Sequence, residues 1–194
     1  MKRDFVNFNR YYNILLGDVY PAPPDAGHTK LMRGIMHEWI TALKSVHTVL
    51  DVGCGDKAIA EPFFKKLGIE YTGVSLGLDV HKLNALGKNV VNGDFNFLED
   101  FSDDSFDLLF SRHSLEHSPA PLLTLFEWHR VSKHLLCLVV PNPEHWGRVG
   151  QNHYSVLYKD QWKFLAERVG WGVMWEKDTT EEYWFMFEKK RTYD

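Results

Sequence analysis

A glycine turn after an apolar run is the first feature of this chain whose residue types could do chemistry. Residues 49–55 read VLDVGCG, so an apolar segment containing Asp51 leads directly to Gly53 and Gly55. Glycines let the backbone approach a ligand closely because no Cβ stands in the way. A strand that enters such a turn before a helix is a common nucleotide-binding arrangement at the edge of an open α/β sheet. The segment therefore predicts a site for a nucleotide-like ligand.

Polar residues also end three later strand-like segments. Ser75 lies in YTGVSL at 71–76, Asp94 lies in NGDF at 92–95, and Ser111 lies in SFDLLFSRHSLEH at 105–117. In open α/β sheets, ligands bind outside the carboxyl ends of the strands. We therefore expect these residues to lie near the glycine turn.

The elements that must position these residues alternate along the chain. Apolar, strand-like runs and helical runs follow one another, which favours a parallel sheet covered on both faces. The expected strands are 48–52, 71–76, 90–92, 106–111 and 135–140, and the expected helices are 28–44, 58–67, 80–86, 119–131 and 159–169. Two last strands, 171–176 and 182–189, are joined by a turn too short for a crossover helix, so they must be antiparallel neighbours. The prediction is an α/β fold with a doubly wound, Rossmann-like, mostly parallel seven-stranded sheet and a C-terminal antiparallel hairpin.

Composition narrows the class of protein. The chain has 194 residues, a formal net charge of −4 and two cysteines. This length favours one domain, with 1–27 as an N-terminal arm or lid and 28–194 as the core. The acidic balance gives no general attraction to nucleic acid or to a membrane. Few cysteines and no signal-like or membrane-spanning run predict a cytoplasmic protein, and the oligomeric state stays open.

In this order, the four motifs and the hairpin make the chain resemble the class I S-adenosylmethionine-dependent methyltransferases, of the small, single-domain, methyltransferase-11-like kind. The resemblance covers roughly residues 30–190. It implies S-adenosyl-L-methionine as cofactor and methyl transfer to an unidentified small-molecule or glycan-like acceptor. The residues that it implies for cofactor binding are Asp51, Gly53, Cys54, Gly55, Ser75, Leu76, Asp79, Asp94, Phe95, Ser111, Arg112 and His113.

The resemblance also implies roles. Asp51 would order the amino-acid end of the cofactor, Asp94 would accept a hydrogen bond from the adenine amino group, and Phe95 would flank the ring. The turn at 111–113 would lie beside the methionine moiety. Family members usually carry an acidic residue where Ser75 stands, so Asp79 is the nearest substitute carboxylate.

Three alternatives remain. Ser75 and the absent third glycine of the turn would suit a non-catalytic binding module with the same fold. A nucleic-acid methyltransferase is disfavoured by the acidic balance and by the absence of an NPPY-type tetrapeptide. A nicotinamide enzyme would fit the glycine spacing, but it needs an acidic residue or an arginine near Ser75.

The acceptor is expected beside residues that follow the fourth and fifth strands. His117 and His153 are the candidate catalytic residues, because a histidine can remove a proton from an acceptor. For His117, a structural role at the start of the next helix is favoured over catalysis. His145 and His153 are eight residues apart on a loop without cysteines or paired carboxylates, which is poor zinc spacing, so we expect no metal.

Overall fold

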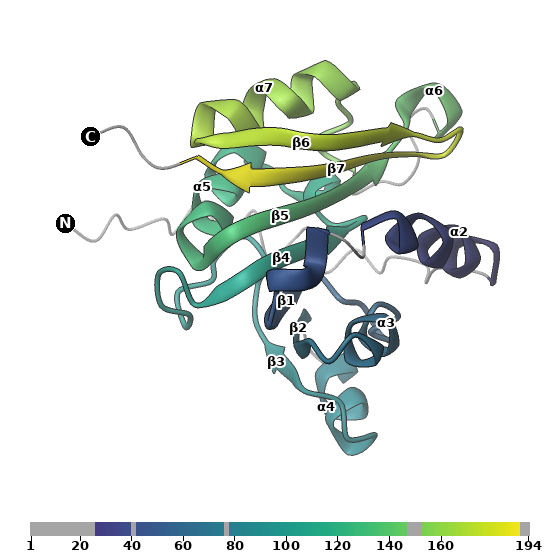
Figure 1. The fold of residues 1–194 in the computed structure, drawn as a ribbon, viewed down its shortest axis with the longest axis vertical. Helices are drawn as coiled ribbons and strands as arrows, with labels where there is room; N and C mark the ends of the chain where they lie inside the picture. The colour runs from purple at the N-terminus through teal and green to yellow at the C-terminus, as the bar shows by residue number, and fades with distance from the viewer. Residues whose placement is uncertain (1–25, 40–41, 76–77, 147–152, 191–194) are drawn as a thin grey trace.

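A seven-stranded sheet organises the chain (Figure 1). The computed structural model describes residues 26–39, 42–75, 78–146 and 153–190. The predicted arm at 1–27 therefore lies almost entirely outside the described residues. The strand order is β3-β2-β1-β4-β5-β7-β6. The strands are β1 (Thr48–Val52), β2 (Glu70–Ser75), β3 (Val90–Asn92), β4 (Phe106–Arg112), β5 (Ser132–Pro141), β6 (Trp171–Asp178) and β7 (Glu182–Lys189).

The directions of the strands confirm the predicted fold class. β1 pairs in parallel with β2 and β4, β2 with β3, and β4 with β5. β7 pairs antiparallel with β5 and with β6, so the hairpin finishes the sheet beside β5. The order reverses between β1 and β4, which makes their carboxyl ends the switch point where such sheets bind ligands.

Helices cover both faces of the sheet. The helical segments are α2 (Ala26–Met36), η1 (His37–Trp39), η2 (Ala42–Ser45), α3 (Glu61–Lys66), α4 (Leu78–Ala85), η3 (Leu115–His117), α5 (Pro121–Val131), α6 (Pro143–Trp146) and α7 (Lys159–Val169). One apolar core joins the sheet to α2, α3 and α4, and a second joins the other face to α5 and α7 (Figure 1). No helix among the described residues is long and apolar enough to cross a membrane.

Four predicted helices have different bounds in the structure, and the one expected at 80–86 is α4, Leu78–Ala85. The helix expected at 28–44 ends at Met36 and continues as 3₁₀ turns. The helix expected at 58–67 begins only at Glu61, because Ala58 has a φ of 46°, which an α-helix cannot contain. The helix expected to start at 119 begins at Pro121, whose ring suits the first helical turn.

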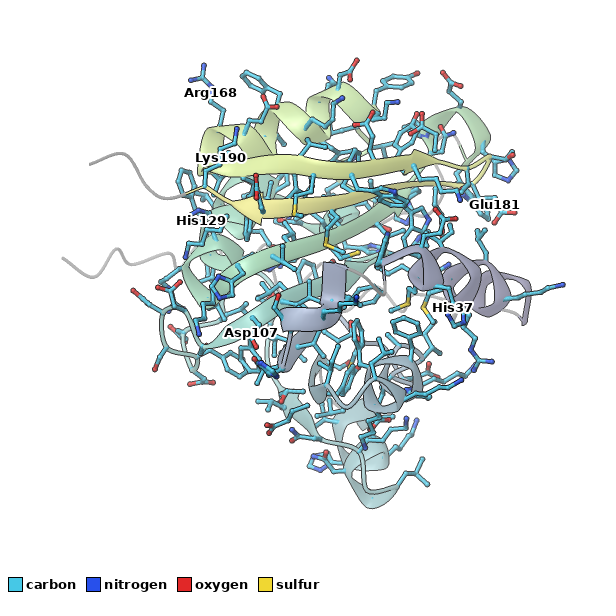
Figure 2. All side chains as sticks on the ribbon, in the orientation of Figure 1. His37, Asp107, His129, Arg168, Glu181 and Lys190 are labelled. Carbon is cyan, nitrogen blue, oxygen red and sulfur yellow. The ribbon has the colours of Figure 1, made fainter. Side chains whose placement is uncertain are left out.

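Asp107 fastens two parallel strands to each other at the amino end of the sheet. Asp107 lies at the amino end of β4, and Glu181 lies in the hairpin turn at the carboxyl end of β5 (Figure 2). Asp107 Oδ2 accepts the backbone N–H groups of His47 at 2.8 Å and Thr48 at 3.1 Å. The Asp107 backbone N–H in turn donates to Thr48 Oγ1 at 3.0 Å. These bonds fasten β4 to the start of β1.

Candidate functional site

The two glycines of the first turn are needed for different reasons. Gly53 and Gly55 have φ values of 79° and 64°, which favour glycine. The backbone N–H groups of Gly53 and Cys54 donate to the Val74 carbonyl at 3.0 Å, which ties the turn to β2. A Cβ on Gly53 would lie 2.1 Å from Ser114 Oγ, whereas one on Gly55 would meet no described atom within 4 Å. Gly53 is therefore required by packing against this protein's own Ser114, and Gly55 is the glycine that faces open space.

Asp51 is a buried carboxyl near the carboxyl end of β1. Its side chain accepts a hydrogen bond of 2.5 Å from the Tyr71 hydroxyl. Burial raises the pKa of Asp51 to about 7, and the Tyr71 hydrogen bond and the positive charge of Arg112 oppose this shift only in part. A carboxyl with this pKa gains its charge near neutral pH, and a cationic ligand group beside it would favour the charged form.

The end of β2 carries Ser75, which is half-buried and pairs in register with Asn92 of β3. The Ser75 carbonyl accepts the backbone N–H of Gly93 at 3.0 Å. Of the other residues predicted here, Leu76 lies outside the described residues. Asp79 belongs to α4, but its side chain also lies outside the description. The suggestion that Asp79 replaces the usual acidic residue stays a prediction.

Asp94 and Phe95 follow β3 and are both engaged with the protein. Asp94 Oδ1 accepts the backbone N–H of Asn96 at 2.8 Å and its side-chain amide at 2.9 Å, which shapes the turn. The Phe95 carbonyl accepts Trp128 Nε1–H at 2.7 Å, and the two rings meet edge to face at 6.4 Å. Phe95 therefore packs against α5. Its contact with a ligand ring stays a prediction.

A buried network of charges lies where β4 ends. Glu182, on β7, has no exposed surface and accepts hydrogen bonds from Arg112 at 2.5 Å and Trp184 Nε1 at 2.7 Å. Its carboxylate also contacts His113 Nε2 at 2.7 Å. Burial lowers the pKa of His113, but Glu116 and Glu182 outweigh it and raise the value to about 9. His113 is thus a cation held between carboxylates at neutral pH.

Two residues near the end of β4 have unusual local structure, one in its backbone and one in its side-chain hydrogen bonding. His113 has a φ of 55°, in the left-handed region that non-glycine residues rarely occupy. Ser111 is fully buried, and its Oγ has no hydrogen-bond partner among the described residues. Both features are unusual in a purely structural turn and are typical of binding sites.

Beyond the network lie Glu116 and the two predicted catalytic histidines. Glu116 is 1% exposed, and its Oε1 is 3.5 Å from His113 Nδ1 and 3.9 Å from His117 Nε2. The rings of His117 and His153 meet edge to face with centroids 4.7 Å apart. Burial lowers the pKa of His153, so this imidazole is neutral near pH 7. The structure therefore brings together the two histidines that the sequence singled out separately.

Two residues at the site were missed by the sequence analysis. Tyr71 sits within an apolar run, and nothing in its position signals a bond to Asp51, 20 residues earlier. Glu182 opens the last strand, and only the pairing of β5 with β7 brings it to Arg112 and His113. A charged residue that begins an otherwise apolar strand was the available signal.

Comparison with known proteins agrees with the motifs. Residues 50–135 match a family model described as a methyltransferase domain, which is less than half of this 194-residue chain. No curated protein sequence matches the chain. Among solved structures, a SAM-dependent methyltransferase from Archaeoglobus fulgidus matches with a TM-score of 0.68 and 20% identity, covering 83% of this chain and 94% of that one.

Two further structures share the fold. A SAM-dependent methyltransferase from Aquifex aeolicus has a TM-score of 0.66 and 21% identity, and covers 86% of this chain and 100% of its own. A putative methyltransferase of Haloferax volcanii, solved in complex with the Trm112 methyltransferase activator, has a TM-score of 0.67 and 17% identity. That match covers 87% of this chain and 96% of the other. The predicted resemblance to class I methyltransferases is confirmed over residues 50–135, and the solved structures share the fold.

Proposed function

We propose that this chain, which has the fold and a family match of the class I methyltransferases, binds S-adenosyl-L-methionine and methylates a small-molecule or glycan-like acceptor. One observation carries the proposal: the matched segment, 50–135, includes the carboxyl ends of β1 to β4, and Asp51, Ser75 and Asp94 lie at those of β1, β2 and β3, on the same edge of the sheet as the Gly55 turn. The order of these strands reverses between β1 and β4, next to that turn.

The residues present fit this cofactor. The open space at Gly55 leaves room for a ligand against the backbone. Asp51, ionised on binding, would pair with the ammonium group of the methionine part. Ser75 would accept from a ribose hydroxyl. Asp94 would accept from the adenine amino group, with Phe95 at the ring. When bound, the cofactor would supply an electrophilic methyl group, whose carbon an acceptor atom could attack in line while the sulfur departs as a neutral thioether.

The acceptor would be held beyond the end of β4, beside side chains that could orient it and take its proton. His113 and Arg112 are fixed by Glu182, so this wall of the site is rigid. His153 is neutral near pH 7 and lies against His117, so the His153 imidazole could take a proton from an acceptor hydroxyl or amine. Positioning of the acceptor in a dry site is the main contribution that the protein makes to such a transfer.

Binding of S-adenosylhomocysteine tests the proposal without a known acceptor. The product should raise the thermal midpoint of the purified protein, because a ligand that binds only the folded state stabilises it. Asp94→Ser keeps an oxygen that can accept the Asn96 N–H but does not reach adenine. We expect it to weaken binding by about 1–3 kcal/mol.

The matched control is Asp100→Ala, which removes an exposed carboxylate of the turn before β4 and should leave affinity unchanged. An absent thermal shift in the wild type would contradict the proposal and favour a non-catalytic module with this fold. Equal affinities in Asp94→Ser and Asp100→Ala would contradict the assigned adenine position.

A further inference from the structure

Three metal-ligating side chains meet beyond the end of β4. Glu116 and His117 belong to η3, and His153 belongs to the segment that precedes α7. One carboxylate oxygen of Glu116 and one ring nitrogen of each histidine all lie within 4.8 Å of one another. His145, the histidine whose spacing argued against zinc, is not part of this cluster. The argument from spacing tested the wrong pair, because the fold joins His153 to His117.

The backbone holds the two halves of the cluster in place. The Glu116 carbonyl accepts the backbone N–H groups of Tyr154 at 2.9 Å and Ser155 at 3.0 Å. The Ser155 hydroxyl donates to the Ser118 carbonyl at 2.8 Å. These three bonds clamp the segment that carries His153 onto η3. The ligand atoms are therefore positioned by main-chain contacts that do not involve the ligand side chains themselves.

The Glu116 carboxylate is buried and is compensated by the charge of His113, but without a close hydrogen bond from any described residue. It is 1% exposed, and neither oxygen has a hydrogen-bond partner of good geometry among the described residues. The nearest positive or polarisable groups are the ring nitrogens of His113 and His117, at 3.5 and 3.9 Å. A buried carboxylate needs close hydrogen bonds or a coordinated cation. A metal ion among the three side chains would meet this need.

We propose that Glu116, His117 and His153 bind a divalent transition-metal ion, with Zn²⁺ as the best match. Two imidazole nitrogens and one carboxylate oxygen are the donor set of open zinc sites, which leave a further position for water or substrate. Ligand atoms around zinc lie about 3.4 Å apart, because tetrahedral bonds are about 2.1 Å long. The ligand atoms, now within 4.8 Å of one another, must therefore move closer together to bind a zinc ion.

A second layer of contacts would support the ion. His113 Nδ1 faces the Glu116 carboxylate, and its Nε2 contacts Glu182, which is held in turn by Arg112 and Trp184. Metal-bound carboxylates are generally oriented by such outer partners. In a methyltransferase, the open position would hold an acceptor oxygen, and the bound ion would then replace the histidines as the group that favours loss of its proton. That consequence rests on the proposed function, but metal binding itself does not.

Calorimetric titration of the metal-free, full-length protein with Zn²⁺ tests the proposal, and titration with Co²⁺ adds a visible spectrum that reports the geometry. We expect one saturable equivalent of Zn²⁺ in the wild type. Glu116→Gln and His153→Asn should each weaken it by tenfold or more, as loss of a ligand or of its support generally does. Circular dichroism of each apo variant reports whether it folds.

The matched control is the double variant Glu144→Gln/His145→Asn, which changes the same residue types at exposed positions in α6. It should bind Zn²⁺ as the wild type does. Equal affinity in the wild type and His153→Asn, or no saturable equivalent in the wild type, would overturn the proposal. Should Glu116→Gln fail to fold, His153→Asn decides alone, since His153 lies outside any helix or strand. Binding of S-adenosylhomocysteine, measured with chelator, separates these outcomes from failure of the proposed function.

Discussion

Buried charged side chains at the two ends of β4 are compensated by different kinds of partner. At the amino end, Asp107 is paired with backbone N–H groups of His47 and Thr48. These bonds outweigh burial and hold the pKa of its carboxyl below the usual range. At the carboxyl end, Arg112 and His113 are paired with a side chain, Glu182, from a distant strand. The first arrangement fastens strands, and the second builds a site whose charges depend on one another.

Crowded or left-handed backbone occurs near both ends of β4, since Asp104, just before the amino end, has a φ of 51°. Gly53 leaves no room for a Cβ beside Ser114, and His113 adopts a left-handed φ. Both lie at the carboxyl end of the sheet, where the cofactor and acceptor are proposed to bind. Strained residues persist only where the surrounding structure holds them, and they gather at functional sites. We therefore expect substitutions at the carboxyl end to affect both stability and binding, and substitutions at the amino end to affect stability alone.

The largest effect is expected from Glu182→Ala. It removes the fully buried partner of Arg112, His113 and Trp184, and leaves buried positive charge without compensation. We expect a loss of about 3–5 kcal/mol in the free energy of unfolding. Urea denaturation measures it, with Glu188→Ala, at an exposed position of the same strand, as the control that should change little. A loss below about 1 kcal/mol would show that the network is not the support described here.

Gly53→Ala should have the next largest effect on stability. The added Cβ would meet Ser114, and the alanine would have to adopt a φ of 79°. We therefore expect the free energy of unfolding to fall by about 3 kcal/mol. Gly55→Ala has no such contact and should cost only about 1 kcal/mol, from its φ of 64°. Thermal unfolding of both variants checks this difference. Adding Ser114→Gly should restore part of the stability of Gly53→Ala, and no recovery would exclude the contact with Ser114 as the cause.

At the opposite end, Asp107→Ala should cost about 1–2 kcal/mol, because two backbone N–H groups lose their acceptor. The affinity for S-adenosylhomocysteine should stay that of the wild type, since Asp107 lies at the far end of the strand. Chemical denaturation and calorimetry measure the two quantities separately. A large fall in affinity would erase the distinction between the two ends.

The smallest effect concerns Asp51 and pH. Since burial raises its pKa to about 7, the free protein holds this carboxyl mostly protonated at pH 6, and it must lose the proton to pair with an ammonium group. Affinity for S-adenosylhomocysteine should therefore fall as the pH drops below 7, by at most about tenfold per pH unit. Asp51→Asn should bind more weakly at pH 7.5 and show a flatter profile. An unchanged profile in the variant would remove Asp51 from the cofactor site.

Much of the fold followed from local patterns in the sequence. The apolar runs predicted the five parallel strands, and the short polar turn before Glu182 predicted the antiparallel hairpin. The late start of α3 was missed, because the left-handed φ of Ala58 is imposed by the surrounding turn and not by an alanine's own preference. Local preference yields to tertiary contacts at such positions.

The candidate site was less predictable, because its contacts join distant segments. Each predicted residue at the carboxyl edge of the sheet could be placed there because it lies at or just after the end of a predicted strand. The bond from Arg112 to Glu182 spans 70 residues of sequence, and no local pattern indicates it. The meeting of His117 with His153 depends on backbone bonds from Tyr154 and Ser155 to Glu116, which residue types do not encode.

Calorimetry with S-adenosylhomocysteine on the wild type, Gly55→Ala and Asp107→Ala tests the central claim most directly. A Cβ at Gly55 enters space that no described atom of the protein fills, so it should obstruct a ligand while leaving the fold largely intact. We expect one-to-one binding in the wild type and in Asp107→Ala, and affinity at least about tenfold weaker in Gly55→Ala. No binding by the wild type, or equal binding by Gly55→Ala, would contradict the claim that this turn holds the cofactor.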